Sequence, residues 1–155
     1  MKDRVAIALA LLPILSSSAT EPAGALRREF YEAFRTGQVR IIELTKEVSG
    51  REHPEDVEPC GRWHLTELGV RTFFLRAEPI TGPEWHHGYD QFGCDYTGTL
   101  VARGRTYKFT INVGASAFVY TGAGAGADAW IYGCKHCKRL FPREFWYDYG
   151  NADAG

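Results

Sequence analysis

The chain has 155 residues, of which 45% are hydrophobic, and its 18 basic and 19 acidic residues give a formal net charge of −1 at pH 7. A chain of this length and composition is typical of one folded domain with a single core. The near-balance of charge argues against nucleic acid as a partner, because phosphate binding needs a concentrated positive surface.

Residues 1–19 have the three-part pattern of a secretory signal peptide. Two basic residues precede a mostly apolar run at 5–15, and Ser17 and Ala19 are small residues suited to a cleavage site. The apolar run is shorter than the roughly 20 residues that a membrane-spanning helix needs. We therefore expect an exported protein, periplasmic or secreted, with one domain at 20–155 and no membrane insertion once the signal is removed.

The next segments predict a helix, a strand and a loop. Apolar residues recur at spacings of three and four in 23–36, which indicates an amphipathic helix that Gly37 would end. The segment 39–48 fits two patterns, because some of its apolar residues alternate as in a strand while others would line a helix. We predict a strand. Residues 49–61 are polar with two prolines and predict a surface loop.

Residues 69–77 (GVRTFFLRA) are rich in β-branched and aromatic residues. This composition predicts a strand. Pro79, Gly82 and Pro83 then interrupt regular structure.

Residues 93–120 predict a β-hairpin on which the rest of the domain is built. Apolar and polar residues alternate in both arms, which is the pattern of half-buried strands. Arg103 and Gly104 lie between the arms, and glycine allows the positive φ of a tight hairpin turn. A two-residue loop sets Leu100 opposite Tyr107, so that apolar residues face apolar partners along both arms.

The remaining segments complete a sheet. Residues 117–120 predict a short third strand, 122–127 (GAGAGA) a connection, and 129–134 a further strand before an aromatic and basic tail at 135–149. Strands outnumber helices and do not alternate with them. The sequence therefore predicts an α+β fold: a single small domain, mainly antiparallel β-sheet with an N-terminal helix, stabilised by disulfides.

The four cysteines, Cys60, Cys94, Cys134 and Cys137, predict two disulfides, because an even number of cysteines in an exported domain is usually paired. We expect Cys94 to pair with one of Cys134 and Cys137, and Cys60 to pair with the other. No cofactor is expected.

The spacing of Cys134 and Cys137 also fits two other functions. It is the spacing of a thioredoxin-type redox pair, although no strand-helix-strand unit accompanies it here. It is also half of a four-ligand zinc site, but no second pair of comparable spacing occurs. Further zinc ligands could come from His136, His86, His87, His64 or Cys60. We give more weight to structural disulfides than to either function.

The segment 83–90 (PEWHHGYD) is the densest polar cluster in the chain. Glu84 and Asp90 could be the paired carboxylates of a hydrolase, and His86 or His87 its base. No Gly-x-Ser-x-Gly motif is present to supply a serine nucleophile. One polar segment without partners elsewhere specifies no reaction, so a surface loop is the favoured interpretation.

The aromatic residues supply the last candidate site. Phe145, Trp146 and Tyr147 follow one another, and no single face can bury all three rings, so at least one should lie at the surface. Exposed Trp and Tyr side chains suit an interaction surface. The predicted binding residues are Trp85, His86, His87, Trp146 and Tyr147.

These observations favour a small exported binding protein that engages another macromolecule, with a protein as partner and a role of the inhibitor or immunity-protein type. The alternatives are an envelope hydrolase acting through the 83–90 segment and, with less support, a redox or zinc protein. The absence of any complete catalytic constellation in the sequence favours binding over catalysis.

Overall fold

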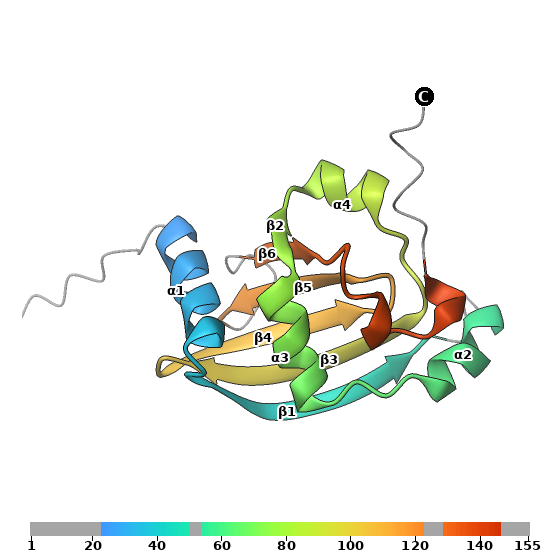
Figure 1. The fold of residues 1–155 in the computed structure, drawn as a ribbon, viewed down its shortest axis with the longest axis horizontal. Helices are drawn as coiled ribbons and strands as arrows, with labels where there is room; N and C mark the ends of the chain where they lie inside the picture. The colour runs from blue at the N-terminus through green and yellow to red at the C-terminus, as the bar shows by residue number, and fades with distance from the viewer. Residues whose placement is uncertain (1–22, 50–53, 123–128, 147–155) are drawn as a thin grey trace, which may run out of the picture.

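In the computed structural model, which describes residues 23–49, 54–122 and 129–146, a sheet of six antiparallel strands carries helices on one face (Figure 1). The strands are β1 (Val39–Val48), β2 (Glu78–Ile80), β3 (Cys94–Ala102), β4 (Arg105–Asn112), β5 (Ser116–Thr121) and β6 (Ala129–Gly133). The helices are α1 (Ala23–Arg35), α2 (Val57–Arg62), α3 (Glu67–Arg76) and α4 (Gly82–Gly88), with 3-10 turns η1 (Pro54–Asp56), η2 (Lys138–Leu140) and η3 (Arg143–Phe145). The predicted α+β fold, antiparallel with an N-terminal helix and two disulfides, is confirmed. The signal peptide predicted at 1–19 lies outside the described residues.

The strands lie in the order β1-β3-β4-β5-β6-β2, so the predicted hairpin forms the middle of the sheet. Its register is the predicted one, with Leu100 opposite Tyr107 and Tyr96 opposite Ile111. The turn is also as predicted. Arg103 (φ 48°) and Gly104 (φ 80°) both have positive φ, as a type I′ turn requires. The third strand predicted at 117–120 is confirmed as β5, and the strand at 129–134 as β6.

The face of the sheet that packs against α1 and α3 is called the core face below (Figure 1). The apolar stripe of α1 is buried there, which confirms the predicted amphipathic helix. Phe30 lies at its centre and is 1% exposed. Its ring centroid lies 5.0–6.3 Å from those of Phe34, Phe74, Tyr107, Trp130 and Tyr132. Aromatic contacts between α1, α3 and the strands β4 and β6 therefore form the interior of the domain.

We predicted a strand at 69–77, but residues 69–76 belong to the helix α3 and Ala77 follows its end, so that prediction is wrong. The hydroxyl of Thr66 accepts a hydrogen bond from the Gly69 backbone N–H at 3.1 Å and caps the start of the helix. Val70, Phe73 and Phe74 are buried and recur at spacings of three and four, as on one side of a helix. Burial of this side against α1 and the sheet outweighs the strand preference of its aromatic and branched residues.

The predicted surface loop at 49–61 is also wrong in its second half, which forms η1 and α2. Cys60 is fully buried there, and the carboxylate of Asp56 accepts a hydrogen bond from the Gly93 N–H at 3.2 Å. The side chain of Lys46 on β1 donates to three carbonyl groups at the end of this segment, at 2.9–3.1 Å. Polar contacts and one buried cysteine thus hold this segment in place. Such contacts need no regular spacing of apolar residues, so the helix could not be recognised from the sequence.

The ambiguous segment 39–48 is the strand β1, as predicted, but it carries an irregularity between Ile41 and Glu43. The irregularity shifts the alternation of side chains. Val39 and Ile41 are buried before it, Ile42 and Glu43 are both exposed, and the half-buried residues after it are Leu44 and Lys46.

Candidate functional site

The face of the sheet opposite α1 and α3, called the far face below, carries a row of aromatic side chains. The strand β5 places Phe118 and Tyr120 there, because they alternate with the buried Ala117 and Val119. Trp85 of α4 packs edge-on against Phe118 with ring centroids 5.1 Å apart, and Phe118 stacks on Tyr120 at 6.3 Å. All three of these rings are half-buried. Trp85, Phe118 and Tyr120 are called the aromatic row below.

The helix α4 holds Trp85 in this position. Thr81 and Glu84 form a capping box in which the Glu84 carboxylate accepts from the Thr81 N–H at 2.7 Å and from its hydroxyl at 2.8 Å. The helix α4 directly follows the edge strand β2 in the chain. From this helix the Trp85 indole N–H donates to the Ser116 hydroxyl oxygen at 3.3 Å. The segment 83–90, for which we predicted a surface loop, is therefore mostly helical. Its aromatic ring is oriented by a hydrogen bond as well as by packing.

His86 and His87 follow Trp85 on α4, and both are exposed. Their ring centroids lie 5.1 Å apart, and that of His86 lies 6.5 Å from that of Trp85. The structure thus brings together three of the predicted binding residues. Two polar imidazoles lie beside a row of three larger rings.

The predicted hydrolase residues are not arranged as an acid and a base. The hydrogen bonds from Thr81 to Glu84, first from its backbone and then from its side chain, lower the pKa of the Glu84 carboxyl. A general acid needs the opposite shift. Asp90 is exposed, and among the described residues no hydrogen bond joins it or Glu84 to His86 or His87.

Trp146, the other predicted tryptophan, lies in a separate place in the tail. Its indole N–H donates to the Phe141 carbonyl at 2.9 Å, and the guanidinium of Arg143 lies over its ring at 5.5 Å from the centroid. The ring is 39% exposed, whereas Phe145 beside it is buried against Phe92. The expectation that at least one ring of this run lies at the surface is met by Trp146. Tyr147 lies outside the described residues.

The cysteines form two disulfides, as predicted, but with different partners: Cys60–Cys94 and Cys134–Cys137, with Cα atoms 5.7 and 5.5 Å apart. The predicted pairing of Cys94 with the CxxC pair is wrong because β3 and β6 are not neighbours in the sheet. The buried end of α2 brings Cys60 to Cys94 instead. Cys134 and Cys137 can then pair with each other, because the turn that follows β6 brings them together.

The CxxC pair is buried, with Cys134 and Cys137 each 1% exposed. The residues after Cys137 form the short 3-10 turn η2, so the pair lacks the α-helix whose N-terminus activates a redox thiolate. Within the described ranges, no three His, Cys, Asp or Glu side chains cluster as a metal site would require. In the same ranges no helix is long and apolar enough to cross a membrane.

Two residues of the aromatic row, Phe118 and Tyr120, were not among the predicted site residues. A signal for them exists, since Phe118 and Tyr120 share one face of a predicted strand whose other face is apolar as well. The contact with Trp85 could not be predicted, because it depends on the path of α4 around the sheet edge. In comparisons with protein-family models, with curated proteins and with solved structures, no match to this chain is found.

Proposed function

We propose that this is a small exported binding protein that engages another protein through the aromatic row. The observation that carries the proposal is the contact of Trp85 with Phe118 and of Phe118 with Tyr120 on the far face. Trp and Tyr are the residue types most enriched among the side chains that dominate protein–protein binding energy. An inhibitor or an immunity-type protein is the kind of function that such a surface would serve.

The rigidity of the row supports this proposal. Phe118 and Tyr120 are fixed on a strand in the middle of the sheet, and the Ser116 hydroxyl orients Trp85. Side chains that are already ordered lose little conformational entropy when a partner binds. His86 and His87 would then form the polar rim that surrounds the centre of an interface.

Export is supported by the cysteines. Disulfides form and persist in oxidising compartments, and both pairs of this domain are closed. The proposed location is the periplasm or the extracellular medium. Nothing in the proposal requires a cofactor.

The proposal is tested by replacing the rings of the aromatic row. A partner would first be captured from secreted and envelope fractions on the immobilised protein, and its affinity would then be measured by calorimetry. Trp85→Ala and Tyr120→Ala should each weaken binding by about 2 kcal/mol, roughly thirtyfold. Tyr31→Ala is the matched control, because Tyr31 is a 41% exposed aromatic residue on the opposite side of the sheet.

Melting temperatures would be measured for every variant to exclude unfolding. If Tyr31→Ala weakens binding as much as Tyr120→Ala, the interface is not the aromatic row. Trp146→Ala tests the second predicted patch in the same way. A turnover that Glu84→Gln abolishes in a folded protein would establish the hydrolase instead and contradict the proposal.

A further inference from the structure

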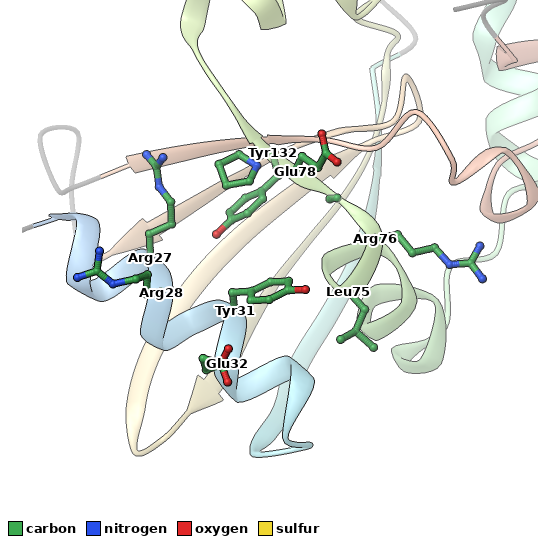
Figure 2. Close-up of a pocket in the computed structure, with 10 residues that line it drawn as sticks. Arg27, Arg28, Tyr31, Glu32, Leu75, Arg76, Glu78 and Tyr132 are labelled. Atoms are coloured by element: carbon green, nitrogen blue, oxygen red, sulfur yellow. The ribbon is translucent and has the colours of Figure 1, made fainter.

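A cavity of about 450 Å³ lies at the other side of the sheet, between α1, the end of α3, β2 and β6. Its volume is in the range of cavities that bind small molecules. Figure 2 shows the side chains that line it, with Tyr31 of α1 directed toward Leu75 of α3 and Tyr132 reaching from β6 toward α1. None of these residues belongs to the aromatic row.

The mouth of the cavity is apolar. Tyr31 and Leu75 are 41% and 43% exposed, and they are two of the few large hydrophobic side chains in the described ranges that reach solvent. Pro79 of the edge strand β2 adds a third apolar wall. Exposed hydrophobic side chains that converge on one hollow indicate a binding site more than isolated ones do.

A buried polar group lies at the inner end of the cavity. Tyr132 is 1% exposed, and among the described residues its hydroxyl has no hydrogen-bond partner. The Nε of Arg27 beside it is likewise buried without a partner there. Buried donors are nearly always satisfied in folded proteins, so these two donors are free to bind an acceptor that reaches them from the cavity. Burial raises the pKa of Tyr132 to about 12, so its hydroxyl stays protonated and can donate.

The charges around the cavity favour an anion. Of the two carboxylates that line it, Glu32 is engaged by Arg35, with its oxygens 3.0 and 3.2 Å from the Arg35 Nε. Figure 2 shows the carboxylate of the other, Glu78, pointing away from Tyr31 and Leu75. Three arginines also line it, and Figure 2 shows that the head groups of Arg28 and Arg76 point away from the cavity. Arg27 differs from these two, because its Nε is buried without a partner among the described residues and its charge acts on Tyr132. It is the arginine placed to meet a ligand, together with the Tyr132 hydroxyl.

We propose that this cavity binds a small amphipathic carboxylate. The carboxylate accepts hydrogen bonds from the Tyr132 hydroxyl and from the guanidinium of Arg27, and the apolar body of the ligand lies between Tyr31, Leu75 and Pro79. A carboxylate suits this pair of donors because it is acceptor-only when ionised and can take two donors at once. This site is independent of the proposed protein interface on the far face, and either can exist without the other.

Octanoate is a suitable probe, and its binding would be followed by calorimetry and by amide NMR shifts. We expect saturable binding with shifts concentrated on α1, the end of α3 and β6. Three matched compounds test the two halves of the ligand. Octylammonium and 1-octanol keep the apolar body without the anion, and butyrate keeps the anion with a short body, so each should bind at least tenfold more weakly.

Two variants test the donors. Tyr132→Phe removes only the unsatisfied hydroxyl and should preserve the fold, while Arg27→Met keeps an apolar stem of similar length. Each should weaken octanoate binding about tenfold or more and leave 1-octanol binding nearly unchanged. Arg28→Met is the matched control, because its head group points away from the cavity (Figure 2), and it should change octanoate binding less than about threefold.

The proposal is overturned by any of three results. The first is an octanoate titration that does not saturate, which would mean that solvent or another part of the chain fills the cavity. The second is equal binding of octanoate and octylammonium, which would mean that the site has no preference for an anion. The third is unchanged octanoate affinity in both Tyr132→Phe and Arg27→Met, with the folded state of each verified by its melting temperature.

Discussion

The two faces of the sheet are made by the same strands and differ in almost every physical respect. The core face carries closely packed rings from β4 and β6 against α1 and α3, whereas the far face carries threonines, a lysine and the aromatic row. The alternation of side chains along a strand produces both. Adjacent residues such as Phe109 and Lys108 consequently lie in different environments, the first buried and the second exposed.

This separation means that stability and recognition can be changed independently. A substitution on the core face should act mainly on the free energy of unfolding, and one in the aromatic row should act mainly on the proposed binding of a partner. The cavity beside Tyr31 lies between α1, the end of α3 and the edge strand β2, and none of the residues that line it belongs to the aromatic row.

The largest effect is expected for Phe109→Ala. Phe109 is 1% exposed, and its ring lies edge-on to Phe74 with centroids 5.8 Å apart. Emptying such a site typically costs about 3–5 kcal/mol. Lys108→Ala, one residue earlier and on the far face, should change stability by no more than about 0.5 kcal/mol. Both free energies of unfolding would be measured by urea denaturation.

Equal losses in the two variants would contradict the assignment of faces. A control is available on the neighbouring strand β3, where Thr99→Ala should behave like Lys108→Ala because Thr99 lies directly opposite Lys108. The slope of the urea transition should stay constant in all three proteins, which would show that the compactness of the unfolded state has not changed.

The central hairpin could be predicted from the sequence because its information is local. The period of two, the Arg103-Gly104 turn and the pairing of apolar residues all lie within 93–120, and together they determine the register. The helix α1 was predictable for a similar reason, since its buried residues repeat at helical spacing within one segment.

Features that depend on distant contacts could not be predicted. The composition of 69–77 favours a strand, and it is the burial of Phe73 and Phe74 under α1 that makes it a helix. The disulfide partners depend on the order of strands in the sheet, which the sequence does not give. The same applies to the candidate site, where Trp85 was predicted but its contact with Phe118 arises only from the fold.

A smaller effect on the core face is expected for Gly98→Ala. A Cβ atom at this position would collide with the Phe109 ring and lie 2.5 Å from the backbone oxygen of Glu43. Backbone cannot move aside easily, so we expect a loss of about 1–3 kcal/mol in the free energy of unfolding. Gly61→Ala is the matched control, because no heavy atom would lie within 4 Å of its Cβ and the residue is helical. That variant should be neutral or slightly more stable.

Equal destabilisation by the two alanines would show that the contact with Phe109 and Glu43 is not the cause, because the loss of glycine's backbone freedom alone stabilises the folded state. A double variant, Gly98→Ala with Phe109→Leu, gives a second readout. If the ring is the obstacle, the second change should recover part of the loss, and the two effects should not add.

The smallest effect is expected on the far face, at Asp95. Its carboxyl lies opposite Glu47 on β1, and it accepts a hydrogen bond from the Asn112 side chain at 2.9 Å. Burial raises the pKa of Asp95, the hydrogen bond from Asn112 lowers it, and the charge of Glu47 raises it further, with a net increase. A raised pKa in the folded state means that folding favours the protonated carboxyl.

The stabilising contribution of the protonated Asp95 is therefore complete below the unfolded pKa and is lost as the pH rises through the folded value. Asp95→Asn is a permanent neutral substitute, since its amide oxygen can still accept from Asn112. We expect the variant to be more stable than the unmodified protein at pH 7 and equal to it at pH 3, with a difference smaller than that at Gly98. Urea denaturation at both pH values gives the comparison. A variant that is less stable at pH 7 would show that the ionised carboxylate is favourable, and that the far face stabilises charge in a way that its burial does not predict.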